Sequence, residues 1–231
     1  MTVAAPRTDP AGGEATQLAS DMVLVHKVFR RELRLLPPLV AAVAPGQVER
    51  AALLGRHYRE IASALRHHHQ AEQDLLWRRL SERAPLDPAT EDRMRQGHRR
   101  HAELLGELDG MLDLWLAAAD RDVRDLLVDI LTELAGDVAA HLDMIESRVL
   151  PEVDRHFSQR EWLALGLRAA SWIPLNRMAW MLGAMLEDAT DAERRNLMGK
   201  VPAPARMLYR MVGQEQYVRE MRELRRSAVP A

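Results

Sequence analysis

Cysteine is absent from the 231 residues of this chain, and its absence excludes several kinds of site. Disulfide bonds, zinc ribbons, iron–sulfur clusters and thiol catalysis all require that side chain. A strong net charge is also missing, because 32 basic and 34 acidic side chains leave a formal charge of −2. This balance gives no electrostatic basis for binding nucleic acid or a membrane surface, and we expect neither partner.

Long apolar runs are missing as well. The runs without a charged residue, such as Met178 to Leu186, are far shorter than the roughly 20 residues of a membrane-spanning helix. The first residues, MTVAAPRTDPAGGEATQ, contain no apolar core, so we expect a disordered tail over residues 1–14 and not a secretory signal. Together these features favour a soluble, cytoplasmic protein, present as a monomer or a homodimer.

Apolar residues recur at three- and four-residue steps along four long segments, which is the spacing of amphipathic helices. The first two helices are expected over residues 14–43 and 47–83. Asp87 is a typical N-cap for a third helix, and Asp120 for a fourth that continues to about Pro151. Two adjacent prolines near the end of the first helix should kink or interrupt it.

No strand pattern competes with this periodicity, so the sequence predicts an all-α fold. Because the connections are short, we expect an up-down-up-down four-helix bundle over residues 15–156. Capping boxes that begin at Ser158 and Thr190 predict further helices in a C-terminal extension, residues 157–231. The tryptophans and methionines of this extension should mainly pack against the bundle; a dimer surface or a channel to a buried site are the alternatives.

The second helix contains three consecutive histidines within the stretch RHHHQAEQDLLWRRL, residues 66–80. His68 and Glu72 are four residues apart and therefore share one helix face. Imidazole and carboxylate are ligands that suit first-row metals such as iron, manganese and zinc. A solvated histidine patch is the alternative interpretation, and the positions of the other histidines distinguish the two.

Histidines on the apolar stripes of all four helices lie at matched depth. We count the depth of each histidine from the turn that joins its helix to the next, at about 1.5 Å of rise per residue. The depths of histidines on joined helices then agree to within about 9 Å. His57 fails this test, because it lies about 16 Å from His68 along the same helix, and we expect it to be a core or second-site residue. The positions that converge are His26, His68, His98 with His101, and His141.

The remaining histidines are expected elsewhere. His67 and His69 point away from the apolar stripe and should contact the ligands from outside or lie at the surface. His156 follows Pro151 and should be exposed.

A carboxylate on the fourth helix is less easily placed. Ile145 occupies the position four residues after His141 and cannot bind a metal. Glu146, five residues after His141, lies well off the stripe, so it must reach inward or the helix must be locally distorted. Asp137, four residues before His141, is the rival candidate.

These positions resemble the metal ligands of the hemerythrin family, also named hemerythrin-like or HHE cation-binding domains, over roughly residues 18–156. The resemblance implies two non-haem iron ions, bridged by carboxylates and by oxo or hydroxo, that bind dioxygen or react with peroxide or nitric oxide. It further implies terminal histidine ligands and two bridging glutamates. The full set is His26, His68, Glu72, His98, His101, His141 and Glu146.

The match departs from the family pattern at two points. Hemerythrin itself has two histidines four residues apart on its third helix, whereas His98 and His101 are three apart, so that either both or only one can be a ligand. Many relatives also have an acidic residue where Ile145 stands, which leaves the second bridge open between Glu146 and Asp137.

Other metal sites fit less well. Ferritin-like oxygenases use Glu-x-x-His pairs, and no histidine here has a glutamate three residues before it. A structural zinc site uses four ligands, fewer than the six or seven found here. We therefore expect a di-iron protein that binds dioxygen or related oxidants for sensing, delivery or detoxification. The alternatives are a di-iron oxidase or peroxidase acting on a small organic substrate, and a mononuclear or degenerate site in an interaction domain.

Overall fold

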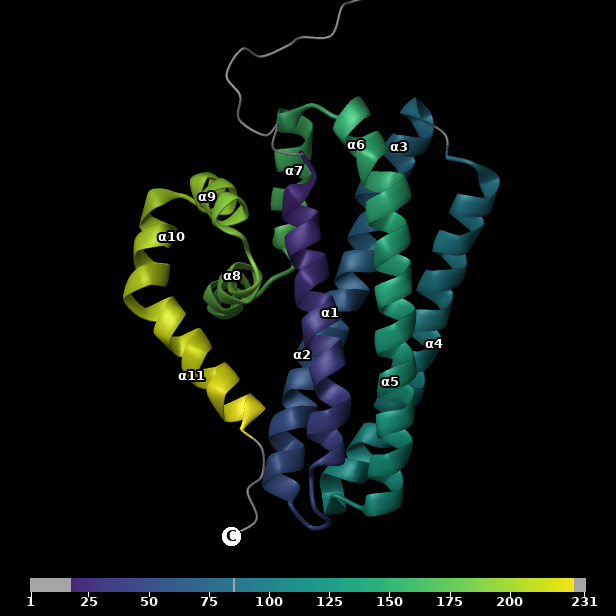
Figure 1. Ribbon diagram of the computed structural model, residues 1–231, viewed down its shortest axis with the longest axis vertical. Helices are drawn as coiled ribbons and strands as arrows, with labels where there is room; N and C mark the ends of the chain where they lie inside the picture. The colour runs from purple at the N-terminus through teal and green to yellow at the C-terminus, as the bar shows by residue number, and fades with distance from the viewer. Residues whose placement is uncertain (1–17, 85, 227–231) are drawn as a thin grey trace, which may run out of the picture.

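The computed structural model describes residues 18–84 and 86–226, and this part of the chain is helical with no strand. Four long helical segments stand side by side, with shorter helices beside them (Figure 1). The prediction of an all-α fold with additional C-terminal helices is therefore confirmed. The tail expected at residues 1–14 lies outside the described residues.

The long segments agree closely with the predicted helices. Asp87 caps its helix by accepting a 3.0 Å hydrogen bond from the backbone N–H of Thr90. Asp120 caps the next helix by accepting from the backbone N–H groups of Asp122 and Val123. The segments are α1 (Ser20–Ala41); α2 (Val48–Ala71) with η1 (Glu72–Trp77) and α3 (Arg78–Arg83); α4 (Pro88–Ala118); and α5 (Arg121–Met144) with η2 (Ile145–Val149) and α6 (Leu150–His156).

The four segments pack in a ring: α1 contacts α2 and α5, and α4 contacts the same two helices from the other side. In Figure 1 the chain passes from α1 to α2 and from α4 to α5 at the lower end, and from α3 to α4 at the upper end. The helix α1 continues through Pro37 and Pro38 to Ala41, so the prolines do not interrupt it. The interior of the ring is the space in which the site must lie.

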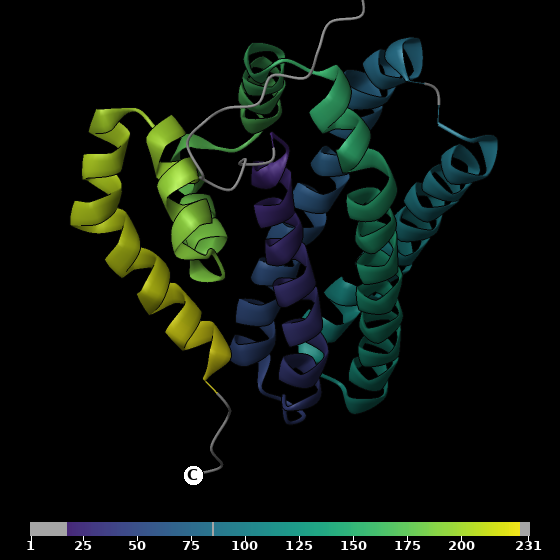
Figure 2. The same ribbon diagram turned by 45° about the horizontal axis from the view of Figure 1, so that its top comes forward.

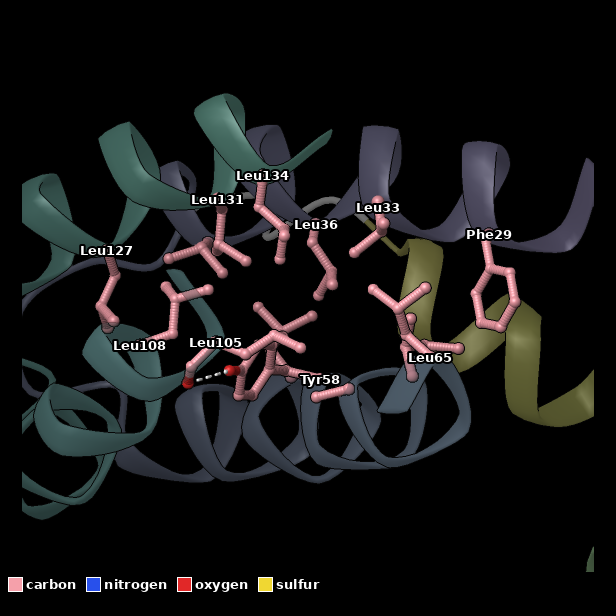
Figure 3. Close-up of a cluster of buried hydrophobic side chains, with 14 of the residues drawn as sticks. Phe29, Leu33, Leu36, Tyr58, Leu65, Leu105, Leu108, Leu127, Leu131 and Leu134 are labelled. Carbon is pink, nitrogen blue, oxygen red and sulfur yellow. Dashed lines mark hydrogen bonds between the residues drawn. The ribbon is translucent and has the colours of Figure 1, made fainter. Parts of the chain in front are cut away.

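Leucines from all four segments fill the lower part of this interior (Figure 3). Each fully buried leucine stabilises the fold by roughly 1.5–3 kcal/mol, and Leu36, Leu65 and Leu134 are completely buried. At one end of this core the Phe29 ring lies 5.2 Å from the ring of His68. The leucine core thus fixes the helices directly beneath the histidines.

The C-terminal extension lies beside α1 and α2, on the side away from α4 (Figures 1 and 2). Both predicted capping boxes are formed, at Ser158 and at Thr190. The helices are α7 (Gln159–Ala170), η3 (Leu175–Arg177), α8 (Met178–Glu187), α9 (Asp191–Lys200), α10 (Ala203–Leu208), η4 (Tyr209–Gly213) and α11 (Gln214–Arg225).

A buried polar network joins this extension to the bundle. Arg31 on α1 donates to Glu32 (2.7 Å) and to Asp188 at the end of α8 (2.6 Å). Glu32 is fully buried and also accepts a 3.0 Å hydrogen bond from His57 Nε2. The imidazole of His57 packs against Trp180 of α8. His57 therefore belongs to this network and not to the histidine cluster, as predicted.

Within the described residues, none of the helices combines the length and the apolar character needed to cross a membrane.

Candidate metal centre

Six histidines and one glutamate gather between the four long helical segments, beyond the end of the leucine core. His26 is completely buried, and the exposed fractions of Glu72 and His101 are 2% and 1%. Every long segment contributes at least one member, so the cluster exists only in the folded bundle. The members are His26, His68, His69, Glu72, His98, His101 and His141.

The cluster contains two groups whose ligand atoms lie within 4.8 Å of one another. One consists of His26, His68 and Glu72, and the other of Glu72 with His69, His98 and His141. Glu72 belongs to both. Its Oε1 lies 3.3 Å from His68 Nε2, and its Oε2 lies 3.1 Å from His98 Nε2. The two oxygens of one carboxylate therefore face different groups.

A local change of helical pitch accompanies the site on two segments. The π-helical turn η1 begins at Glu72, and η2 begins at Ile145, four residues after His141. A π-turn holds more residues than an α-turn, so it changes which side chains share a face, and such turns are frequent at functional sites. Glu146 was expected either to reach inward or to lie on a locally distorted helix, and the structure shows the distortion.

Glu146 lies at the edge of the cluster and belongs to neither group. Its carboxylate is 2.8 Å from His26 Nδ1 and accepts a 2.7 Å hydrogen bond from Arg30. His26 Nε2, the other ring nitrogen, points into the cluster without a hydrogen-bond partner. Glu146 therefore orients His26 from outside. Asp137, its rival, lies partly exposed beside Arg100, with 3.8 Å between Oδ2 and Nε.

His69 does not lie at the surface, because its side chain is buried and faces the other histidines, within one of the two ligand groups. Its ring stacks on the ring of His98 with 4.2 Å between centroids and lies 5.1 Å from the ring of His101. The physical reason is that α2 has two neighbours in the ring of helices. His68 faces His26 on α1, and His69, one residue on, faces α4.

A signal for His69 was present in the sequence. It precedes Glu72 by three residues, and side chains three apart also share a helix face. The other two histidines outside the stripes lie as predicted: His67 is half-buried and stacks on Trp172, and His156 is exposed.

His101 is in the cluster, yet it belongs to neither group of ligand atoms. Its ring contacts the rings of His69 and His141, at 5.1 and 5.2 Å between centroids. Burial lowers the pKa of His101 to about 4, although a hydrogen bond with the backbone of Asp137 opposes this shift.

The protonation states of the cluster residues suit the binding of a cation. Burial lowers the pKa of His26. It also lowers the pKa of His69 to about 2 and the pKa of His141 to about 3, so these three imidazoles are neutral at pH 7. Burial alone would raise the pKa of Glu72, but the neighbouring histidines His68, His98 and His69 together outweigh it and hold the value well below normal. Neutral imidazoles around an ionised carboxylate are the protonation states that metal binding requires.

Unsatisfied polar atoms are concentrated here. Of nine buried side-chain nitrogen and oxygen atoms without a hydrogen-bond partner in the described structure, six belong to the cluster. Each such atom costs about 1–3 kcal/mol, so six cost on the order of a domain's whole stability, about 5–15 kcal/mol. Metal bound by the two groups would satisfy all of them except the one on His101. They are Nε2 of His26, His68, His69 and His141, Nδ1 of His101 and Oε1 of Glu72.

The fold and the cluster define a class: a helical-bundle protein with a buried histidine and glutamate site that can hold metal. A family model described as the hemerythrin HHE cation binding domain matches residues 17–153, more than half of the chain. The chain belongs to this family. No curated protein and no solved structure matches it.

Proposed function

We propose that this protein is a non-haem di-iron protein that binds dioxygen or a related small oxidant, peroxide or nitric oxide. Sensing, delivery or detoxification of the oxidant would be its role. The observation that carries the proposal is the position of Glu72, whose two oxygens face two separate groups of imidazole nitrogens. One carboxylate shared by two groups supports two ions at one centre.

The donor atoms suit iron. One ion would be held by His26, His68 and Glu72, and the second by Glu72 with His69, His98 and His141. Nitrogen and oxygen donors of this kind are typical of non-haem iron sites. Iron, when bound, supplies the reversible redox and oxidant-binding chemistry that the side chains themselves lack.

The two groups differ in the number of protein ligands they offer. The group with His26 has three donors, and the group with His98 has four. A ligand-binding metal keeps a position free of protein, whereas a structural metal is closed. We therefore assign oxidant binding to the side of the centre formed by His26 and His68. Glu146 and Arg30 fix the His26 ring there.

A di-iron oxidase or peroxidase acting on a small organic substrate is the second candidate. The observation that favours it is a cavity of about 400 Å³, one wall of which is His98. Dioxygen alone does not need a space of this size, since a water molecule's share of liquid volume is about 30 Å³.

Reconstitution with ferrous iron under anaerobic conditions tests the proposal. We expect two irons per chain by elemental analysis, and changes in the optical spectrum on addition of dioxygen, peroxide or azide. Glu72→Gln should hold at most one ion, whereas His156→Gln, a change at an exposed histidine, should keep both. A single tightly held ion per unmodified chain, or equal metal loss from the two variants, contradicts the dinuclear assignment.

A further inference from the structure

A cavity of about 400 Å³ lies beside the metal centre, between the η1–α3 segment and the first turns of α4. These elements meet at the upper end of Figure 1, and helices α8 to α11 of the C-terminal extension lie on the opposite side of the bundle. The lining contains no residue of that extension. The tryptophans and methionines predicted as a possible channel lining therefore do not form this one.

The walls of the cavity are apolar, and its entrance is polar. Trp77, Leu80, Leu86 and Met94 line the walls. At the entrance, Arg95 lies 2.5 Å from Asp92 and 3.7 Å from Glu91, and Arg78 lies 3.9 Å from Glu82. The entrance charges are thus already paired, so the cavity favours an uncharged molecule.

Gln73 connects the cavity to the metal centre. Its side-chain amide lies 3.1 Å from His98 Nδ1, and the opposite nitrogen of that ring, Nε2, faces Glu72 Oε2 at 3.1 Å. With a metal at Nε2, the ring carries its proton on Nδ1, which donates to the side-chain oxygen of Gln73. Both Gln73 and His98 line the cavity. Within the described residues, the amide N–H groups of Gln73 then have no other partner. One hydrogen-bond donor is therefore available to a molecule in the cavity.

The size of the cavity indicates what kind of molecule it takes. Small-molecule sites are typically about 300–1,000 Å³, mostly apolar, with a few polar groups that fix orientation. A cavity of about 400 Å³ lies within that range. It holds on the order of ten times the volume of a water molecule, which corresponds to one aromatic ring with substituents.

We propose that this cavity binds a small neutral phenol or alcohol. Its apolar body packs against Trp77 and Met94, and its hydroxyl oxygen accepts a hydrogen bond from the Gln73 side-chain N–H, next to His98. This inference deepens the second candidate function, on which it rests, by naming the class of its substrate. Gln73 is a positioning residue for both the bound molecule and the His98 ring.

Binding of 4-fluorophenol, followed by fluorine NMR in the metal-free and the zinc-loaded full-length protein, tests the proposal. We expect saturable binding that Gln73→Leu weakens at least tenfold. The matched control is Gln70→Leu, because Gln70 lies on the same helix and hydrogen-bonds only Asp74 among the described residues. Circular dichroism confirms that both variants are folded.

A second pair of variants tests the location by filling the cavity. Ser81 lines the cavity and is exposed, so Ser81→Trp should abolish binding, while Arg79→Trp, at an exposed position of the same helix outside the lining, should not. Absence of saturable binding to the unmodified protein, or equal weakening by variant and control, overturns the inference. Metal content, measured after reconstitution of the same proteins with iron, separates this failure from that of the proposed function. Two irons per chain without phenol binding would refute only the cavity assignment.

Discussion

Gly97 provides the sharpest test of the geometry at the centre. It lies inside α4, and a Cβ atom added to it would stand 2.5 Å from His141 Nδ1 and 3.1 Å from Cε1 of the same ring. Ordinary contacts between heavy atoms are about 3.5–4.0 Å, so Gly97→Ala must displace the His141 ring by roughly 1 Å. The ring thus packs directly on the α4 backbone, and only glycine leaves room for it.

The magnitude follows from two opposed effects. In a helix interior, replacing glycine by alanine normally stabilises a protein by about 0.5–1 kcal/mol. Ligands, however, must be held to within about 0.5 Å of their productive geometry, and disturbing the support of a ligand typically costs 10–100-fold in metal affinity. We expect Gly97→Ala to lower the affinity of the centre by this factor, about 1.4–2.7 kcal/mol, while the metal-free protein stays folded.

Competition with a chelator of known affinity, using cobalt or zinc as the probe metal, measures the loss. Gly110→Ala is the matched control, because Gly110 lies on the same helix and a Cβ there would meet nothing within 4 Å. Urea unfolding of both metal-free variants shows whether the alanine stabilises the helix. Unchanged affinity in Gly97→Ala, or an equal loss in Gly110→Ala, would show that His141 does not bind metal in the position described.

Three further predictions follow from the cluster and its surroundings. His69→Gln should remove at least one ion per chain by elemental analysis, whereas His67→Gln, a change at a half-buried histidine outside the cluster, should remove none. Equal results would exclude His69 as a ligand. His57→Gln should leave the metal content intact but lower the free energy of unfolding by about 1–3 kcal/mol, because the buried Glu32 carboxylate loses its 3.0 Å hydrogen bond. Metal loss in that variant would contradict the separation of the two sites. The metal-free protein should become less stable as the pH falls below about 6.5, since the buried imidazoles stay neutral in the folded chain but take up protons in the unfolded chain. Each contributes up to about 1.4 kcal/mol per pH unit; a urea midpoint that is the same at pH 7 and pH 5 would refute this.

The fold could be predicted well because its signals are local. Heptad-like apolar spacing identifies each long helix, and Asp87, Asp120, Ser158 and Thr190 cap their helices as expected. Depth counting brought the histidines of four helices to one level, since helical rise is nearly constant. It also separated His57, whose partner is Glu32.

The details of the site depend on packing, which a single periodicity cannot describe. A helix with two neighbours presents two inward faces, and the apolar stripe showed only the one that contains His68, so His69 was missed. The π-turns that begin at Glu72 and Ile145 change which side chains share a helix face, and no residue type in the sequence predicts such a turn. The contact between Gly97 and His141 likewise involves two helices, so the apolar spacing of either helix alone does not predict it.

Because all four helical segments contribute to the centre, ions bound there would act as cross-links in a chain that has no disulfides. His26 and His141 lie near opposite ends of the bundle sequence, and closing a loop of about 100 residues restricts the unfolded chain by several kcal/mol in the case of a disulfide. A metal tie of this kind is reversible. Its dissociation would then set the rate at which the bundle opens, so the lifetime of the folded chain in the presence of a protease would depend on the supply of metal.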